Sequence, residues 1–341
     1  MPSIGIALVI ALVFAAAPAA ADLAADGSWP AGAATPGVPA KVTSASPFSL
    51  ADLDAGLPPV AADVRFYPAE GASAARPAPA VILLHGAGGV SGRREGRYAR
   101  EFTAQGVAVA VIDVFGARGG GRFIERLIKI TESMALADAF ATKAWLAARP
   151  DIDADRIALI GFSYGAMSTT YAAYRQVAEP FAAAFGTTPF AAHVAFYGPC
   201  VARFEDVAAT GAPLLMLWGE HDAIIDPEAC EATAADLARG GAPVTIRRYD
   251  AAHRWDGAGR SWRAPTHIAD CRFTVGRDGT VRDDNSFFVM DGPVGRTAML
   301  ALCANSDGYR IAGDEDVRRR SNAAMARFLN PVLFSRSTPE G

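Results

Sequence analysis

The sequence is poor in several features that mark particular protein classes. It has no excess of positive charge, because 32 Lys and Arg face 36 Asp and Glu, for a net charge of -4. The basic footprint of a nucleic-acid-binding protein is therefore missing, and we expect no nucleic-acid partner. The four cysteines include no Cys-x-x-Cys pair, the spacing typical of zinc and thioredoxin-like sites. No internal repeat is visible, which argues against a repeat architecture.

Long apolar runs are scarce as well. The run at residues 4–17 is shorter than the roughly 20 residues that a membrane-spanning helix needs. Small residues follow it at 19–21, so we predict a secretory signal peptide over residues 1–21, cleaved near Ala21. No Lys or Arg precedes the run, which leaves an uncleaved membrane anchor as the alternative. The first interpretation predicts a periplasmic or secreted protein with no stable membrane insertion after cleavage.

The cysteines are few but even in number, which fits an oxidising compartment. Four cysteines allow three pairings, of which we prefer Cys200 with Cys230 and Cys271 with Cys303. Each bond closes a loop of about thirty residues and contributes roughly 3–4 kcal/mol in the chain-entropy model. Four buried free thiols are the alternative if the signal-peptide prediction is wrong.

What the sequence does contain is the composition of a globular domain, with 51% hydrophobic and 20% charged residues. Residues 22–58 are rich in Ala, Pro and Gly, and we expect an extended arm with little structure of its own. Over residues 59–335, apolar strand-like runs alternate with helical periodicity, which predicts a mostly parallel sheet with helices on both faces. The expected strands are 63–67, 80–84, 107–112, 157–160, 193–196, 214–218 and 244–249, and the expected helices are about 94–105, 131–148, 164–176, 227–239 and 314–329.

One region breaks this alternation. Residues 254–310 are rich in Gly, Asp and Arg, and the segment from Arg272 to Val281 looks like a hairpin with an Asp-Gly turn. We interpret the region as an insertion held by Cys271 and Cys303, and not as a separate domain.

The chain is organised around residues 157–167, where an apolar run of strand length meets Gly-Phe-Ser-Tyr-Gly and a small-residue helical stretch follows. A serine at the apex of such a strand-turn-helix sits in a strained backbone, so its neighbours must be small. Gly161 and Gly165 flank Ser163 at the required spacing, which makes Ser163 a candidate nucleophile. The alternative is an ordinary tight turn with a solvated serine.

A serine hydroxyl needs a base within hydrogen-bond reach and a carboxylate to hold that base. With the serine on such a turn, the acid and then the histidine follow it in the chain. His253, separated by three residues from the end of the predicted strand 244–249, is the preferred base, ahead of His267 inside the insertion. Asp222 follows another buried strand and is the preferred acid, while Asp226 before a proline reads as a helix cap. The alternatives are that His253 is an ordinary surface histidine and that Asp222 belongs to a solvated loop.

Attack on an ester carbonyl also needs donors for the developing oxyanion, usually backbone N–H groups. We expect one from Tyr164, directly after the nucleophile, and one from Ala87 in the glycine-rich stretch after the strand 80–84. A phosphate-binding loop is the rival interpretation of that stretch. It fails because no Lys-Ser/Thr follows, and Ser91 stands where a dinucleotide fingerprint needs glycine.

Several of these pieces together resemble the dienelactone hydrolase family of the α/β-hydrolase superfamily, over residues 60–255. The resemblance implies a triad of Ser163, Asp222 and His253 acting on an ester or lactone. Namesake enzymes of the family use a cysteine nucleophile, so this chain is similar to a serine variant. The matching segments are Leu84-His-Gly-Ala-Gly-Gly89, Asp113-Val-Phe-Gly-Ala-Arg-Gly119, Gly161-Phe-Ser-Tyr-Gly165, Gly219-Glu-His-Asp222 and Ala252-His253.

We therefore expect a serine carboxylesterase with the α/β-hydrolase fold, acting on a small-molecule ester without a metal or organic cofactor. Arg118 in a glycine-rich loop is a candidate for holding a substrate carboxylate, with loop packing as the alternative. Rival functions are peptide cleavage or acyl transfer on the same triad, a catalytically silent binding protein, and a partner-binding protein built on the arm. The oligomeric state is left without a prediction.

Overall fold

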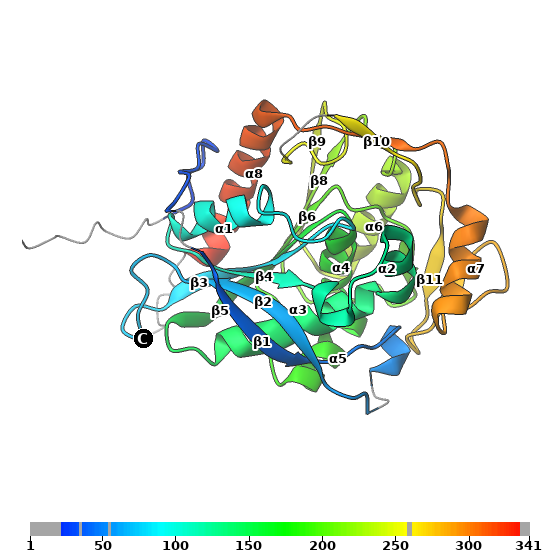
Figure 1. The fold of residues 1–341 in the computed structure, drawn as a ribbon, viewed down its shortest axis with the longest axis horizontal. Helices are drawn as coiled ribbons and strands as arrows, with labels where there is room; N and C mark the ends of the chain where they lie inside the picture. Colours follow the sequence, from blue (N-terminus) through cyan, green and yellow to red (C-terminus); the bar gives the residue numbers. More distant parts are fainter. Residues whose placement is uncertain (1–21, 34–35, 54–55, 258–260, 335–341) are drawn as a thin grey trace, which may run out of the picture.

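The computed structural model describes residues 22–33, 36–53, 56–257 and 261–334. The predicted signal peptide, residues 1–21, lies outside this part of the chain. An eight-stranded sheet forms the centre of the molecule (Figure 1), in the order β1-β2-β4-β3-β5-β6-β8-β9. Its strands are β1 (Val38–Ser44), β2 (Val60–Tyr67), β3 (Ala78–Leu84), β4 (Ala108–Asp113), β5 (Ile152–Phe162), β6 (Ala192–Phe196), β8 (Leu214–Gly219) and β9 (Val244–Tyr249).

Neighbouring strands pair in parallel along the part of the sheet with the order β4-β3-β5-β6-β8-β9. Strand β2 pairs antiparallel with both β4 and β1. Every residue of β3 is buried, because helices cover both faces of the sheet. Ile82 and Leu84 belong to one core, whereas Val81 and Leu83 belong to the other. The apolar run in the sequence is therefore explained by two-sided burial, and the predicted fold class is confirmed.

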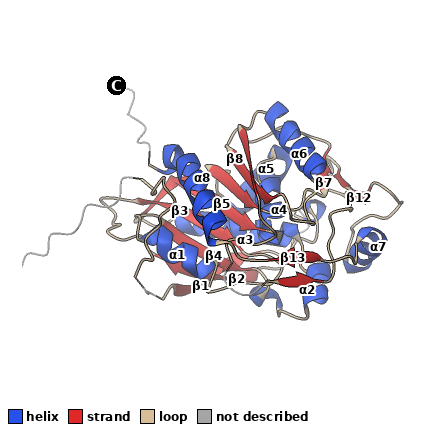
Figure 2. Cartoon of the chain, turned by 90° about the horizontal axis from the view of Figure 1, so that it is seen from above, coloured by secondary structure: helices blue, strands red, loops and turns tan. Residues whose placement is uncertain are grey.

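The helices divide into two layers, as Figures 1 and 2 show. Side chains of α1 and α8 pack with Val81 and Leu83 on one face, and those of α3, α4, α5 and α6 pack with Ile82 and Leu84 on the other. The helices are α1 (Glu95–Thr103), α2 (Phe123–Lys129), α3 (Glu132–Ala147), α4 (Tyr164–Tyr171), α5 (Arg175–Phe185), α6 (Pro227–Arg239), α7 (Pro293–Cys303) and α8 (Glu315–Leu333).

The expectation of an arm with little structure over residues 22–58 is wrong. Strand β1 lies in this segment and pairs with β2 along its whole length, so β1 and not β2 is the edge strand. Leu23 and Trp29 are buried against the α1 and α8 layer, where the Trp29 ring lies 4.8 Å from that of Phe102. The free edge of β2 supplies backbone partners, which a composition rich in Ala and Pro does not reveal.

Some of the helices also differ from the expectation. The single helix predicted over 164–176 is two helices, because α4 ends at Tyr171 and α5 begins at Arg175. Helices α2 and α7 were not predicted at all. Within the described residues, no helix is both long and apolar enough to span a bilayer.

The late insertion forms short strands and one helix. The predicted hairpin is present as β11 (Phe273–Val275) and β12 (Val281–Asp283), with Gly279 at φ +79° in its turn. Strand β11 also pairs in parallel with β7 (Ala202–Phe204), and β10 (Trp262–Ala264) pairs with β13 (Tyr309–Ile311). The insertion is thus joined to the main domain by backbone pairing.

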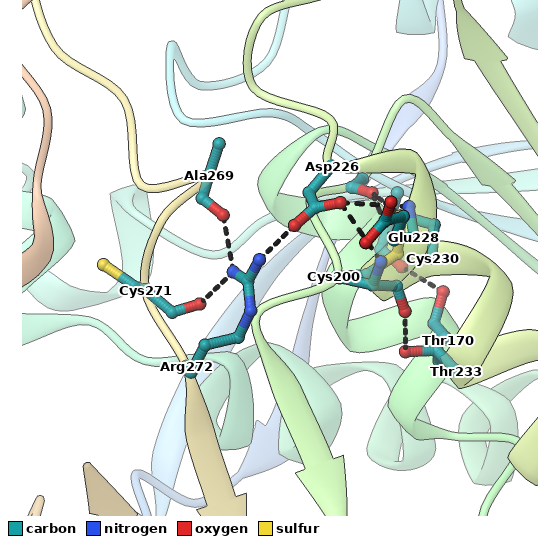
Figure 3. Close-up of a disulfide and its surroundings, with 12 residues drawn as sticks. Thr170, Cys200, Asp226, Glu228, Cys230, Thr233, Ala269, Cys271 and Arg272 are labelled. Carbon is teal, nitrogen blue, oxygen red and sulfur yellow. Dashed lines mark hydrogen bonds and ion pairs between the residues drawn. A yellow bond between two sulfur atoms is a disulfide. The ribbon is translucent and has the colours of Figure 1, made fainter. Parts of the chain in front are cut away.

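Both predicted disulfides, Cys200–Cys230 and Cys271–Cys303, are present. Figure 3 shows how Arg272 fastens the insertion beside Cys271. Its guanidinium donates to the carbonyl oxygens of Ala269 and Cys271 at 2.7 and 2.8 Å, and it pairs with the Asp226 carboxylate. Asp226 also accepts the N–H groups of residues 228 and 229 at the start of α6, as the helix-cap interpretation predicted.

Candidate active site

The turn between β5 and α4 holds Ser163 in a strained conformation, with φ +53° and ψ -111°. A side chain on Gly161 would collide with the carbonyl oxygen of Gly165, and one on Gly165 would collide with that of Leu84. Only glycine fits at both positions, because strand and helix backbones approach too closely for a Cβ atom. The local sequence therefore explains why the Ser163 hydroxyl is presented at the end of β5.

His253 and Asp222 reach this hydroxyl from neighbouring strands. His253 follows β9 and Asp222 follows β8, and the carboxyl ends of parallel strands meet at one edge of the sheet. His253 Nε2 lies 3.1 Å from Ser163 Oγ, and His253 Nδ1 lies 2.7 Å from Asp222 Oδ2. Asp222 Oδ1 also accepts the N–H of Ile224 at 3.2 Å. Both the imidazole and the carboxylate are buried, so water competes little for these bonds.

Two tyrosines that the sequence did not single out hold the imidazole from its sides. The rings of Tyr197 and Tyr309 meet the His253 ring edge to face, with centroids 4.7 and 5.1 Å away. Burial, with the Asp222 charge nearby, raises the pKa of Tyr309 to about 12, so its phenol stays neutral. Tyr309 belongs to β13, whose backbone pairs with His253. The insertion therefore returns to support the histidine, which no local sequence pattern signals.

The two expected oxyanion donors lie beside the serine. Tyr164 is the first residue of α4, where an N–H has no partner within the helix. Ala87 follows β3 and lines the same pocket as Ser163 and Tyr164. His85 braces the Ala87 loop, because its Nδ1 contacts Gly86 O at 2.8 Å and its Nε2 accepts the N–H of Val114 at 3.1 Å. Burial lowers the pKa of His85, which keeps the ring neutral.

The expectation that Arg118 binds a substrate carboxylate is wrong. Its guanidinium donates to both oxygens of Asp138, at 2.7 and 3.0 Å. The remaining donations go to Ser46 Oγ and to the carbonyl oxygens of Ala45 and Val114. All five donors are occupied, so none is left for a ligand. Arg118 fastens its loop to α3 and to the segment after β1.

A pocket of about 300 Å³ opens at Ser163. Residues of α2 and α7 line one side of it. These two helices contact each other, and Figure 1 shows them on the same side of the molecule. Most of the lining is apolar. The lining residues are Ala87, Phe123, Ile124, Leu127, Ile128, Glu132, Ser163, Tyr164, Met167, Pro199, Ile224, Thr266, His267, Ile268, Arg296, Thr297, Leu300, Ala301, Ala304 and Tyr309.

One buried ion pair, between Arg296 and Glu132, lines this pocket. Arg296 of α7 donates to both oxygens of Glu132 at 2.9 and 3.0 Å, and to Leu127 O at 2.8 Å. The Glu132 charge holds the pKa of Arg296 above its usual value despite burial. This pair ties α7 to both α2 and α3. The sequence showed no sign of it, because the two residues lie 164 positions apart.

Comparisons with known proteins identify the family of the chain. The model of the dienelactone hydrolase family matches residues 64–262. A dienelactone hydrolase-like promiscuous phosphotriesterase from metagenomic libraries has a similar structure, with a TM-score of 0.52, 17% identity, and coverage of 87% of this chain and 99% of its own. A putative dienelactone hydrolase from Klebsiella pneumoniae shows a TM-score of 0.45, 22% identity, and coverage of 63% and 87%.

Esterase 2 from Thermogutta terrifontis, in a form phosphonylated by cyclosarin, shows a TM-score of 0.43 and 16% identity over 59% of this chain and 82% of its own. A comparison with curated proteins finds no match. The likeness to the phosphotriesterase structure shows the fold alone. The family model covers more than half of the 341 residues and includes the turn at Ser163 and the loops of Asp222 and His253. The chain belongs to the dienelactone hydrolase family and is a hydrolase that acts on ester bonds.

Proposed function

We propose that this protein is a serine carboxylesterase that cleaves small-molecule esters or lactones through an acyl-enzyme on Ser163. The observation that carries the proposal is the unbroken series of contacts from Ser163 Oγ to His253 Nε2 and from His253 Nδ1 to Asp222 Oδ2. In this arrangement the imidazole can take the hydroxyl proton as the oxygen attacks a carbonyl carbon, while the ionised carboxylate orients the imidazole and stabilises its positive charge.

In the proposed reaction, Ser163 Oγ attacks the acyl carbon while His253 Nε2 takes the hydroxyl proton. His253 then gives that proton to the departing alkoxide, which leaves as an alcohol. A water molecule repeats the sequence, losing its proton to His253, and releases the carboxylic acid. Asp222 accepts the Nδ1–H and so keeps Nε2 free to accept a proton.

The backbone N–H groups of Ala87 and Tyr164 stabilise the oxyanion in both steps. Each such donor typically contributes about 100- to 1,000-fold in rate, because it is fixed before the charge develops. The neutral His85 ring supports this assignment, since it holds the Ala87 loop against the segment after β4.

We also propose that the protein works in the periplasm or outside the cell, after cleavage near Ala21. The two disulfides support this placement, because such bonds persist in oxidising compartments. Full-length protein expressed with its first 21 residues should be recovered in the periplasm or medium, with a mature N-terminus near residue 22. Retention of Met1 in membrane-bound protein would contradict this.

The test of the reaction is a pair of variants with a matched control. Ser163→Ala should abolish labelling by a fluorophosphonate probe and lower kcat for p-nitrophenyl acetate by about 10⁴- to 10⁶-fold. Asp222→Asn should lower kcat by about 10³- to 10⁴-fold through the wrong imidazole tautomer.

The control is Asp226→Asn, which keeps a good helix-capping residue four positions away and should retain kcat within about threefold. A folded Ser163→Ala variant that is labelled like the wild type would refute the proposal. Cleavage of peptides in preference to every ester would favour a peptidase instead.

A further inference from the structure

Given the proposed acyl-enzyme on Ser163, we infer that the pocket under α2 and α7 binds the acyl group, and that this acyl group is an uncharged hydrocarbon chain of medium length. Nothing in the family match specifies such a substrate, because α7 lies beyond the matched residues 64–262. The inference rests on the proposed function and adds the substrate class.

The position of the pocket separates the acyl group from the alcohol. Ser163 and both oxyanion residues, Ala87 and Tyr164, line the pocket, whereas His253 does not. The departing alcohol must lie against His253 Nε2 to receive its proton. The alcohol therefore lies on the His253 side of Ser163, and the acyl group extends toward α2 and α7.

The lining explains why the chain should be apolar. Leu127 and Ile128 of α2 and Leu300 of α7 face the same space as Met167 and Ile224 from the main domain. Burying each CH₂ group of a substrate in such surroundings favours binding by about fourfold. A volume of about 300 Å³ equals roughly ten waters at about 30 Å³ each, which is room for an acyl chain of about eight carbons.

The charges in the wall explain why the chain should be neutral. Glu132 and Arg296 are satisfied by each other through two hydrogen bonds. His267, the other basic side chain in the lining, accepts the N–H of Ala269 at Nδ1. With Arg118 also fully occupied, a carboxylate at the end of the acyl chain would lose its hydration and find no free cation.

The same ion pair limits the length of the chain. Glu132, Met167 and Arg296 stand between this pocket and a second, smaller cavity of about 70 Å³ lined by Phe48, Phe181 and Phe204. A longer chain would have to displace a buried, paired charge, so activity should fall again once the pocket is full.

The experiment measures kcat/KM for p-nitrophenyl esters with acyl chains of two, four, eight and sixteen carbons, and for the eight-carbon ester that ends in a carboxylate. We expect at least a tenfold rise from acetate to octanoate, a fall at sixteen carbons, and at least a tenfold lower value for the carboxylate-ended ester. An unchanged or falling value from two to eight carbons would overturn the inference, and so would preference for the charged ester.

Two neighbouring residues on α7 provide a matched pair of variants. Ala301 lines the pocket, whereas Leu302 does not and its side chain is 61% exposed. Ala301→Trp should lower the ratio of octanoate to acetate kcat/KM at least tenfold, because the indole fills the acyl space. Leu302→Trp should leave that ratio within about twofold. Equal ratios in both variants would overturn the assignment of the pocket.

Failure of the proposed function has a different signature. If no ester is hydrolysed, or if Ser163→Ala keeps the wild-type rate, both the proposed function and this inference are overturned. If hydrolysis depends on Ser163 but does not depend on acyl length, only the acyl pocket is overturned.

Discussion

The turn at Ser163 and the pair α2 and α7, here called the cap helices, face each other across one pocket but are built in opposite ways. Phe162 and Tyr164 beside Ser163 are almost completely buried in the sheet core. In the cap helices, Ile124 is 54% exposed and Val294 is 85% exposed, although both are apolar. The turn is held by backbone packing on all sides, whereas the cap helices depend on a few long-range side-chain contacts.

This contrast separates chemistry from selectivity. A reacting hydroxyl must be held to within about 0.5 Å of its productive position relative to its base, and a strained turn between a buried strand and a helix provides this precision. A wall that contacts a flexible hydrocarbon chain needs apolar area and not precise geometry. We therefore expect changes at the turn to affect rate, and changes in the cap helices to affect the choice of substrate.

The sharpest test of this contrast compares a glycine in each region. Gly165→Ala forces a Cβ atom against the backbone of Leu84, which cannot move without shifting β3. We expect a loss of about 3 kcal/mol in the free energy of unfolding and at least a 100-fold lower kcat, because the Ser163 hydroxyl is displaced. Urea denaturation and p-nitrophenyl acetate hydrolysis measure the two effects.

Gly292, directly before α7, is the control. Nothing lies within 4 Å of a Cβ atom built there, and its φ of 170° is open to any residue. Gly292→Ala should change the free energy of unfolding by less than about 0.5 kcal/mol. If the two alanine variants lose equal stability and rate, the rigid turn and the tolerant cap do not differ as proposed.

The two disulfides offer a second comparison. Cys271–Cys303 joins the last residue of α7 to the start of the hairpin, whereas Cys200–Cys230 joins the loop after β6 to α6. Replacing Cys271 and Cys303 with Ala should cost about 2–4 kcal/mol by the loop-closure effect and make residues 271–303 the first site of proteolysis. It should also lower the octanoate-to-acetate ratio.

Replacing Cys200 and Cys230 with Ala should cost a similar amount while the substrate ratio stays unchanged. Limited proteolysis with mass spectrometry locates the first cut in each variant. A loss of selectivity in the Cys200 and Cys230 variant alone would reverse the assignment of the two regions.

The smallest expected effect concerns pH and stability. His193 on β6 is completely buried, and burial lowers its pKa from 6.5 to about 4. The unfolded chain therefore binds a proton that the folded protein excludes, so stability is complete above pH 6.5 and is lost as the pH falls toward 4. Between pH 7 and pH 5 this single group should cost about 2 kcal/mol. The cap helices contain no histidine and should contribute no such dependence.

Urea denaturation of wild type and of His193→Leu, each at pH 7 and at pH 5, measures this contribution. For each protein, the quantity of interest is the fall in the free energy of unfolding between the two pH values. The fall between the two pH values should shrink by about 2 kcal/mol relative to the wild type. His221→Gln is the control, because His221 is 68% exposed at its side chain. An undiminished fall in His193→Leu would assign the pH dependence to other groups.

Much of the active-site region could be predicted because its constraints are local. The spacing of Gly161 and Gly165 around Ser163 follows from one close approach of two backbones. The position of Asp222 and His253 after apolar strands then follows from how parallel strands end at one edge. Here the structure brings together the residues that the sequence singled out.

Where the prediction was wrong, a partner distant in sequence decided the outcome. Arg118 has the sequence context of a ligand-binding arginine, but its guanidinium forms an ion pair with Asp138 on α3. Strand β1 has weak strand propensity, but it joins the sheet by pairing with the free edge of β2. Neither partner could be chosen from the segment itself.

The sequence by itself determined the turn at Ser163 and the alternation of strands and helices, since each depends on steric rules or periodicity within one segment. Only the tertiary structure decided that α2 and α7, residues 123–129 and 293–303, line the same pocket as Ser163. The physical reason is that a pocket is the space left when distant surfaces pack together, and its shape depends on all of them at once.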